Sequence, residues 1–228
     1  MKTIGLIGGM SWESTVTYYQ VINETIKKAL GGLHSAKLLL YSVDFEEIER
    51  YQAGGEWDKS AAVLADAAQR LEKAGADFIL ICTNTMHKVA PQVRERIRIP
   101  IIHIAEATAD ALKEKGVTKV GLLGTKYTMT QDFYKDKLIA AGLTVVTPEG
   151  EDIETVNSVI YDELCLGIIR EESRQKFLEV IGKLAERGAQ GVILGCTEIG
   201  LLVQQKDTAL PVFDTTLIHA KKAALLSI

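Results

Sequence analysis

Strand-like and helix-like segments alternate along the whole 228-residue chain, and this alternation limits the possible folds more than any other feature. Apolar runs at 3–9, 77–83, 119–125 and 191–197 each end in glycine or small polar residues, and helix-like segments such as the amphipathic 57–75 lie between them. Strands that alternate with helices form parallel sheets. Nearly continuous apolar strands suit sheets that are buried on both faces. The pattern therefore predicts an α/β protein.

The two halves of the chain carry similar motifs. GLIGG at 5–9 is matched by GLLGT at 121–125, and ICTNT at 81–85 is matched by GCTE at 195–198. The matched motifs lie about 113 to 116 residues apart. This internal similarity predicts two pseudo-symmetric domains, each an open parallel sheet with helices on both faces, with an active-site cleft between them.

The last helix is expected to return to the first domain. The first domain then comprises residues 1–98 and 210–228, and the second comprises residues 99–209. No segment rich in Pro, Gly or Ser separates the two, so the connection near residue 98 is expected to be short.

Composition excludes several classes of protein. Lys and Arg number 26 against 30 Asp and Glu, a net charge of −4, which argues against a nucleic-acid partner. No apolar run approaches the roughly 18 residues that span a membrane, and glycines interrupt the N-terminal run too early for a signal peptide.

The three cysteines form no disulfide framework, which predicts a cytoplasmic location. With no HExxH motif and no clustered ligands, no metal site is expected.

Four polar clusters follow the predicted strands, where open parallel sheets bind their ligands. They are Gly8–Ser14, Thr83–His87, Gly124–Thr128 and Cys196–Glu198. The first cluster can bind a carboxylate through amides at a helix N-terminus, or it can simply cap that helix. It lacks the GxGxxG pattern of a dinucleotide site.

The second and fourth clusters hold the most reactive groups. Thr83, Asn84 and Thr85 supply hydroxyl and amide groups that can hold a carboxylate or an ammonium group. Strand alternation turns Cys82 away from Thr83, so we expect Cys82 in the core, and we expect a packing role for Cys165 and a structural role for His87. Cys196 begins a predicted helix, whose N-terminus lowers a thiol pKa. The alternative is a buried, inert cysteine.

Taken together, the motifs resemble those of the aspartate/glutamate racemase family. The resemblance covers essentially the whole chain and rests on GLIGGMSWEST, CTNTMHK, LLGT and GCTEIGLL. The chain is most similar to the branch of broad-specificity or L-aspartate/glutamate-specific amino-acid racemases. The resemblance implies two pseudo-symmetric domains, no cofactor such as PLP, and a homodimer. It also implies two acid/base residues on opposite faces of the substrate α-carbon.

This chain departs from the family pattern at one position. The family usually has a cysteine immediately before Asn-Thr, where this chain has Thr83. The second family cysteine matches Cys196, so the resemblance implies Thr83 and Cys196 as the catalytic pair. A threonine hydroxyl is too weak an acid to stand as an alkoxide base, but it can donate or relay a proton. We therefore expect Cys196 to act on the L face and Thr83 on the D face.

Further residues are expected to bind the substrate. By their positions these are Met10, Ser11, Gln52, Asn84, Thr85, Thr125, Thr197 and Glu198. A second substrate carboxylate favours a cation nearby. Some aspartate racemases place a Lys where this chain has Cys165. Because this chain lacks that Lys, the candidate cations for the second carboxylate are Arg50, Lys88 and Lys126.

The predicted function is interconversion of L- and D-aspartate or glutamate by two-base proton transfer, with an amino acid as the small-molecule partner. One alternative is another reaction on the same scaffold: hydantoin racemisation, maleate isomerisation or malonate decarboxylation. Another is an amino-acid sensor with weak turnover.

Overall fold

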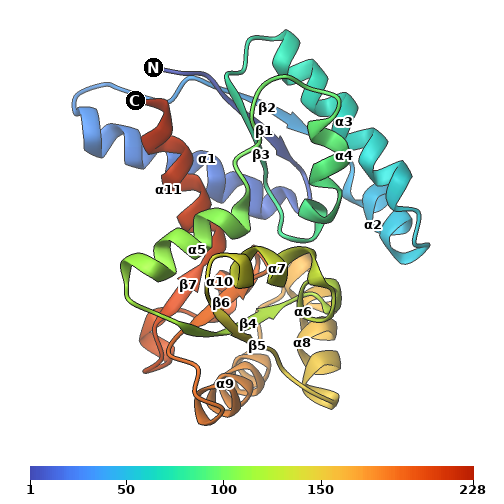
Figure 1. The fold of residues 1–228 in the computed structure, drawn as a ribbon, viewed down its shortest axis with the longest axis vertical. Helices are drawn as coiled ribbons and strands as arrows, with labels where there is room; N and C mark the ends of the chain where they lie inside the picture. Colours follow the sequence, from blue (N-terminus) through green and yellow to red (C-terminus); the bar gives the residue numbers. More distant parts are fainter. The chain divides into compact units, whose positions relative to one another are not determined.

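The computed structural model describes all residues from Met1 to Ile228. They form two compact units: unit 1 consists of Met1–Ile104 and Thr216–Ile228, and unit 2 consists of Ala105–Thr215 (Figure 1). Each unit contains one parallel sheet with helices packed against it. The predicted α/β class with parallel sheets is therefore confirmed.

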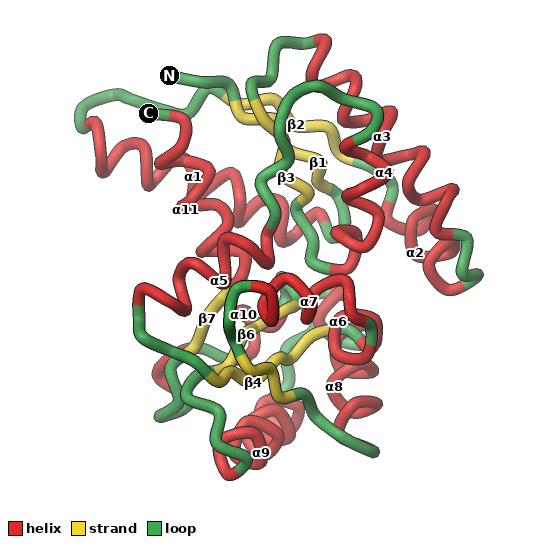
Figure 2. Tube along the Cα trace, in the orientation of Figure 1, coloured by secondary structure: helices red, strands yellow, loops and turns green.

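Unit 1 is built on a three-stranded parallel sheet with the strand order β2-β1-β3 (Figure 2). Its strands are β1 (Ile4–Gly8), β2 (Leu38–Ser42) and β3 (Phe78–Ile81). Its helices are α1 (Trp12–Leu30), α2 (Phe45–Ala53), α3 (Trp57–Lys73), the 3-10 helix η1 (Thr85–Val89), α4 (Ala90–Arg94) and α11 (Thr215–Ser227), which begins at the boundary of the unit.

Both faces of this sheet are covered by helices. In β3, Ile79 and Ile81 point into a core shared with α3 and α4, whereas Phe78 and Leu80 point into a second core shared with α1 and α11. All four side chains are buried. Because side chains of a strand alternate between faces, a strand covered on both sides must be apolar at every position.

Unit 2 is built on a four-stranded parallel sheet with the strand order β5-β4-β6-β7. Its strands are β4 (Lys119–Gly124), β5 (Thr144–Val146), β6 (Val192–Gly195) and β7 (Val212–Asp214). Its helices are α5 (Ile104–Glu114), α6 (Lys126–Thr130), α7 (Asp132–Ala140), α8 (Glu151–Asp162), the 3-10 helix η2 (Leu164–Leu166), α9 (Glu171–Glu186), α10 (Ile199–Leu202) and the 3-10 helix η3 (Gln205–Asp207). A core beneath β4 and β6 is formed with α8 and α9.

The unit boundaries differ by six residues from those expected from the sequence, which placed them after residues 98 and 209. Segment 99–104 belongs to unit 1 because Ile101 forms a parallel bridge with Ile79, extending that sheet beyond β3. Residues 210–215 belong to unit 2 because β7 pairs with β6. Pairing with a neighbouring strand thus decides the membership of both segments.

Candidate active site

The turn between β1 and α1 holds Met10 and Ser11, both of which are buried. Ser11 caps α1, with its hydroxyl accepting from the Ser14 amide at 3.3 Å. The Thr15 hydroxyl accepts from the Gly9 amide at 2.9 Å and donates to the Ser11 carbonyl at 2.8 Å. Helix capping is thus observed here, and the amides of Gly9 and Ser14 are already hydrogen-bonded within the turn.

The first strand of each unit, β1 or β4, ends in a glycine because a threonine side chain of the following helix occupies the space that a Cβ would need. A Cβ on Gly8 would overlap the Thr15 side chain, and a Cβ on Gly124 would meet the Thr128 side chain at 3.0 Å. Both threonines are buried in the first turns of the following helices. Thr15 follows Gly8 by seven residues and Thr128 follows Gly124 by four, so no common spacing in the sequence indicated that the two threonines have the same packing role.

The turn after β3 carries the predicted residues Thr83, Asn84 and Thr85. Asn84 and Thr85 are buried, whereas Thr83 is partly exposed. Cys82 lies in the core with α1 and α11, as predicted, and burial raises the pKa of its thiol. The opposite orientation of these neighbours follows from the alternation of side chains along a strand.

Gln52 reaches the same turn from α2. Its side chain is buried and its amide nitrogen lies 3.0 Å from Met86 Sδ, in η1. Unit 1 thus places Met10, Ser11, Gln52, Thr83, Asn84 and Thr85 at or beside the carboxyl ends of the adjacent strands β1 and β3.

Unit 2 carries the other predicted residues at the carboxyl ends of β4 and β6. Thr125 caps α6, its hydroxyl accepting from the Thr128 amide at 3.4 Å. Cys196, Thr197 and Glu198 follow β6, which pairs directly with β4. All four of these side chains are buried.

One carboxylate oxygen connects the residues after β6. The Cys196 thiol donates to Glu198 Oε2 at 2.9 Å, and the Thr197 hydroxyl donates to the same oxygen at 2.8 Å. A thiol beside a carboxylate can pass its proton to that carboxylate. The Cys196 thiol thus has a proton acceptor within hydrogen-bond distance.

The predicted lowering of the Cys196 pKa is wrong. Burial raises the pKa of this thiol well above its usual value, and the negative charge of Glu198 and the neighbouring Cys165 raise it further. The expected helix N-terminus is weak because α10 has only four residues and begins at Ile199. Desolvation and a like charge thus outweigh the helix dipole. Cys165 packs against the same core, as predicted.

The three candidate cations occupy different environments. Lys126 forms an exposed ion pair with Glu154 at 2.5 Å. The Lys88 ammonium lies 3.7 Å from the centre of the Trp57 ring, and burial lowers its pKa. Arg50 is exposed and lies 5.5 Å from the centre of the Tyr51 ring.

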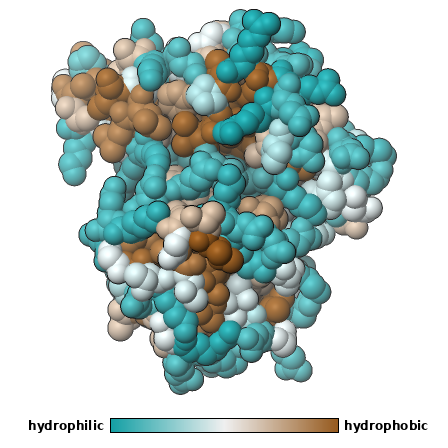
Figure 3. All heavy atoms as spheres, in the orientation of Figure 1, coloured by the Kyte–Doolittle hydropathy of each residue, from teal (hydrophilic) through white to brown (hydrophobic).

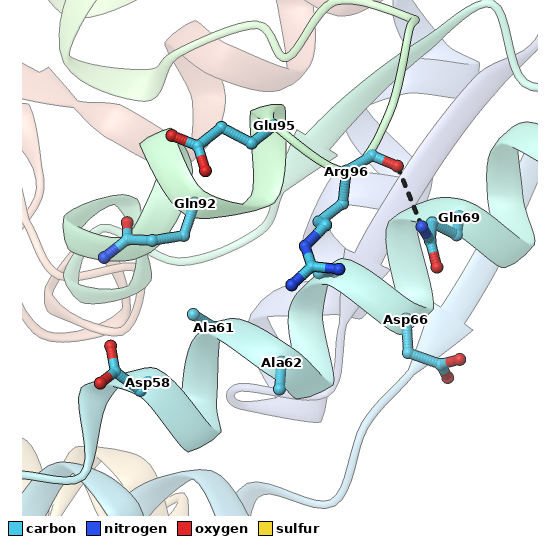
Figure 4. A pocket seen from close by; sticks show the side chains of 9 residues that line it. Asp58, Ala61, Ala62, Asp66, Gln69, Gln92, Glu95 and Arg96 are labelled. Carbon is cyan, nitrogen blue, oxygen red and sulfur yellow. Dashed lines mark hydrogen bonds between the residues drawn. The ribbon is translucent and has the colours of Figure 1, made fainter.

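A cavity of about 410 Å³ lies between α3 and α4 and contains none of the predicted site residues (Figure 4). Asp58 and Glu95 line it along with one guanidinium, that of Arg96, whereas the lining residue Asp66 is ion-paired with Arg70. An excess of carboxylates repels an anionic substrate. This cavity is therefore a poor candidate for binding a dicarboxylate.

No group of three or more His, Cys, Asp or Glu side chains is arranged to hold a metal ion. None of the helices has the length and apolar character needed to cross a membrane.

Comparison with known proteins gives relatives that match nearly the whole chain. Broad specificity amino-acid racemase RacX of Bacillus subtilis (strain 168) is 21% identical, over 96% of this chain and 95% of that protein. A crystal structure of a Yersinia pestis protein described as a candidate Asp/Glu racemase is 56% identical, with a TM-score of 0.93 over 100% of this chain and 99% of that one. An aspartate racemase homologue from Pyrococcus horikoshii OT3 is 38% identical, with a TM-score of 0.86 over 100% and 99% of the two chains.

The sequence profile described as Asp/Glu/hydantoin racemase matches residues 7–223. This match covers both units and every predicted site residue. The chain therefore belongs to the Asp/Glu/hydantoin racemase family, which confirms the predicted enzyme class, a PLP-independent amino-acid racemase.

Proposed function

We propose that this enzyme interconverts the L and D forms of aspartate and glutamate by two-base proton transfer at the α-carbon. Cys196 acts on the L face and Thr83 on the D face. The observation that carries the proposal is the hydrogen bond from the Cys196 thiol to Glu198 Oε2, at 2.9 Å, in a buried group that follows β6.

In the L-to-D direction, Glu198 first accepts the thiol proton, which leaves a thiolate on Cys196. The thiolate removes the α-proton of the L-amino acid and becomes a thiol again, leaving the electron pair on the α-carbon. The Thr83 hydroxyl then gives its proton to the opposite face of that carbon. Water or a neighbouring group returns a proton to Thr83, and Glu198 releases its proton before the next cycle. The proton count therefore balances.

The carbanion needs hydrogen-bond donors at the substrate carboxylate, where its charge is spread. We assign this role to Asn84, Thr85 and Thr197, which are buried and polar. Donors fixed in a buried site stabilise developing charge more than water does. Met10, Ser11, Gln52 and Thr125 are proposed to shape the rest of the pocket, and Glu198 also orients the adjacent hydroxyl.

The two directions should differ in rate. Cys196 has a carboxylate to accept its proton, whereas an alkoxide on Thr83 is a high-energy species. Removal of the α-proton from an L-isomer is therefore easier to begin than removal from a D-isomer. This asymmetry distinguishes the proposal from a mechanism with two equivalent thiols.

Proton NMR in D₂O tests the proposal with L- and D-aspartate and L- and D-glutamate, without added cofactor. We expect loss of the α-proton signal with chiral conversion, faster from the L-isomers. Cys196→Ala should abolish exchange from L-aspartate, and Cys165→Ala is the matched control. Full exchange in Cys196→Ala would refute the assignment. Absence of exchange with all four amino acids would refute the proposed substrate class.

We also propose a homodimer. The support from the structure is exposed apolar surface in unit 1: Leu30 ends α1, Leu33 lies in the turn that follows it, and Leu225 and Leu226 lie near the end of α11. Figure 3 shows apolar surface gathered over these two helices, in the upper left of the view. Exposed apolar patches mark sites of association. Light scattering should give twice the mass of the 25.0 kDa chain, and Leu225→Glu should lower it. The cytoplasmic location stays a prediction.

A further inference from the structure

Three of the four histidines of the chain lie buried together in unit 1. His87, His103 and His219 are 2%, 8% and 0% exposed. The ring centre of His87 lies 4.5 Å from that of His103 and 5.9 Å from that of His219. None of the three has a part in the proton transfers proposed above.

The hydrogen bonds of His219 determine which of its nitrogens carries the proton. Nε2 lies 2.8 Å from the carbonyl oxygen of Ile102, which can only accept, so Nε2 carries a hydrogen. Nδ1 lies 2.8 Å from the Tyr18 hydroxyl. Burial lowers the pKa of His219 to about 3, so the ring is neutral near pH 7 and Nδ1 accepts from Tyr18.

The hydrogen bonds of His87 determine the opposite tautomer. Its Nε2 lies 3.1 Å from the amide nitrogen of Ile104, which can only donate, so Nε2 carries a lone pair. Its Nδ1 lies 2.8 Å from the carbonyl oxygen of Thr83, which can only accept, so Nδ1 carries a hydrogen. Both bonds form together in one state of the ring, the neutral one protonated at Nδ1.

These hydrogen bonds join three parts of unit 1: α11, segment 102–104 and the turn that carries Thr83. The chain leaves the unit after Ile104 and returns at Thr216, near the start of α11. His219 ties α11 to Ile102, and His87 ties Ile104 to Thr83. The turn that carries Thr83 is therefore anchored, through a single imidazole, to the segment by which the chain leaves the unit.

We propose that His87 is a positioning residue that holds the Thr83–Thr85 turn against segment 102–104, and that only its neutral form does so. The link to catalysis rests on the proposed role of Thr83, whereas the anchoring itself does not. A proton on Nε2 would face the Ile104 amide, placing two donors against each other.

Protonation of His87 would also place a positive charge in a buried group. His103 faces the ring from segment 99–104, and His219 faces it from α11. Tyr18 of α1 is hydrogen-bonded to His219. The pKa of His219 is lowered first by burial, then by a positive charge on His87, and least by Lys222. A charge on His87 is therefore unfavourable in these buried surroundings. Acid conditions should therefore release the turn.

Two substitutions separate the two bonds. Asparagine places its amide nitrogen near the position of Nδ1, so His87→Asn can keep the bond to Thr83 and lose the bond to Ile104. Glutamine places its oxygen near the position of Nε2, so His87→Gln can keep the bond to Ile104 and lose the bond to Thr83. Neither the Asn nor the Gln side chain takes up a proton in this pH range, and each keeps one of the two hydrogen bonds. The two variants are therefore matched controls for each other.

The first test is independent of racemase activity. Two-bond ¹H–¹⁵N spectra at pH 7 should show His87 protonated at Nδ1 and His219 protonated at Nε2, with the exposed His34 as reference. Hydrogen exchange at the Ile104 amide should quicken at least tenfold in His87→Asn and less in His87→Gln. A His87 ring that is charged or protonated at Nε2 at pH 7 overturns the proposal, as does unchanged exchange in His87→Asn.

The second test measures turnover of D-aspartate, the direction in which Thr83 acts first. We expect kcat to fall by roughly 10- to 100-fold in His87→Gln, because displaced groups lose much of their catalytic effect. His87→Asn should lose less, and KM should change little in both. In the wild type, protonation of His87 should lower kcat as the pH falls. This part of the dependence of kcat on pH should be absent in both variants. Equal kcat in all three proteins overturns the positioning role. If the wild type has no activity, the proposed function fails while the first test still decides the anchoring.

Discussion

Acid destabilisation of unit 1 provides a quantitative test of the buried histidine group. His219 has a pKa of about 3 in the folded chain, because burial disfavours its charged form, against about 6.5 in an unfolded chain. A depressed folded-state pKa contributes stability that is complete above pH 6.5 and is lost as the pH falls toward 3. The wild type should therefore lose stability through this residue between these two values.

The size of the effect follows from the shift. Well below pH 6.5, each pH unit costs about 1.4 kcal/mol of the free energy of unfolding, since the unfolded chain binds a proton that the folded chain excludes. Lowering the pH from 6.5 to 4.5 should reduce the free energy of unfolding by about 2 kcal/mol through His219 alone, because the unfolded histidine is already half protonated at pH 6.5. Carboxylates add their own effects, so a control that differs only at this residue is needed.

His219→Gln is that control. A glutamine amide can still donate to the Ile102 carbonyl but cannot take up a proton. Both tryptophans, Trp12 of α1 and Trp57 of α3, lie in unit 1, so their fluorescence during urea denaturation reports the unfolding of this unit. The variant should be less stable at pH 7.5, and the difference should shrink by about 2 kcal/mol between pH 6.5 and 4.5. A difference that stays constant over this range would refute the argument that His219 is neutral.

Three further predictions concern the site and the core. Glu198→Gln should lower the pKa of Cys196, because a negative charge that raises it is removed; the pH dependence of alkylation measures this, and a higher pKa would contradict it. Tyr18→Phe should cost about 1–3 kcal/mol in the free energy of unfolding, because a buried histidine nitrogen loses its donor; urea denaturation measures it, and an unchanged midpoint would speak against that bond. In the folded protein a maleimide should label the partly buried Cys165 well before the fully buried Cys82; equal labelling by mass spectrometry would be inconsistent with the core position of Cys82.

Much of the fold could be predicted from local patterns. The runs at 3–9 and 77–83 became β1 and β3 because their apolar residues fill both faces of a covered sheet. The short segment at 99–104 could not be assigned from its sequence, because a single bridge to Ile79 decides its place. Boundaries depend on such pairings, which involve residues far apart in the chain.

The positions of the candidate site residues along the strands could be predicted from the sequence, but the pKa of Cys196 could not. Small polar residues do follow β3 and β6, as expected for ligand sites of parallel sheets. The pKa of Cys196 could not be inferred, because it depends on burial and on the orientation of the Glu198 carboxylate. A helix of four residues was too short to provide the opposite effect.

The sequence by itself determined the alternation of strands and helices, the glycines at the strand ends, and the chemistry available at each turn. These features depend on side-chain size and on periodicities of a few residues. Only the tertiary structure decided the protonation states of the cysteine and histidine side chains. It brings Tyr18 to His219 across 201 positions and His219 to Ile102 across 117, and it buries Cys196 beside a carboxylate. Burial and hydrogen-bond partners set the pKa and the tautomer of a group, and both come from residues distant in the chain.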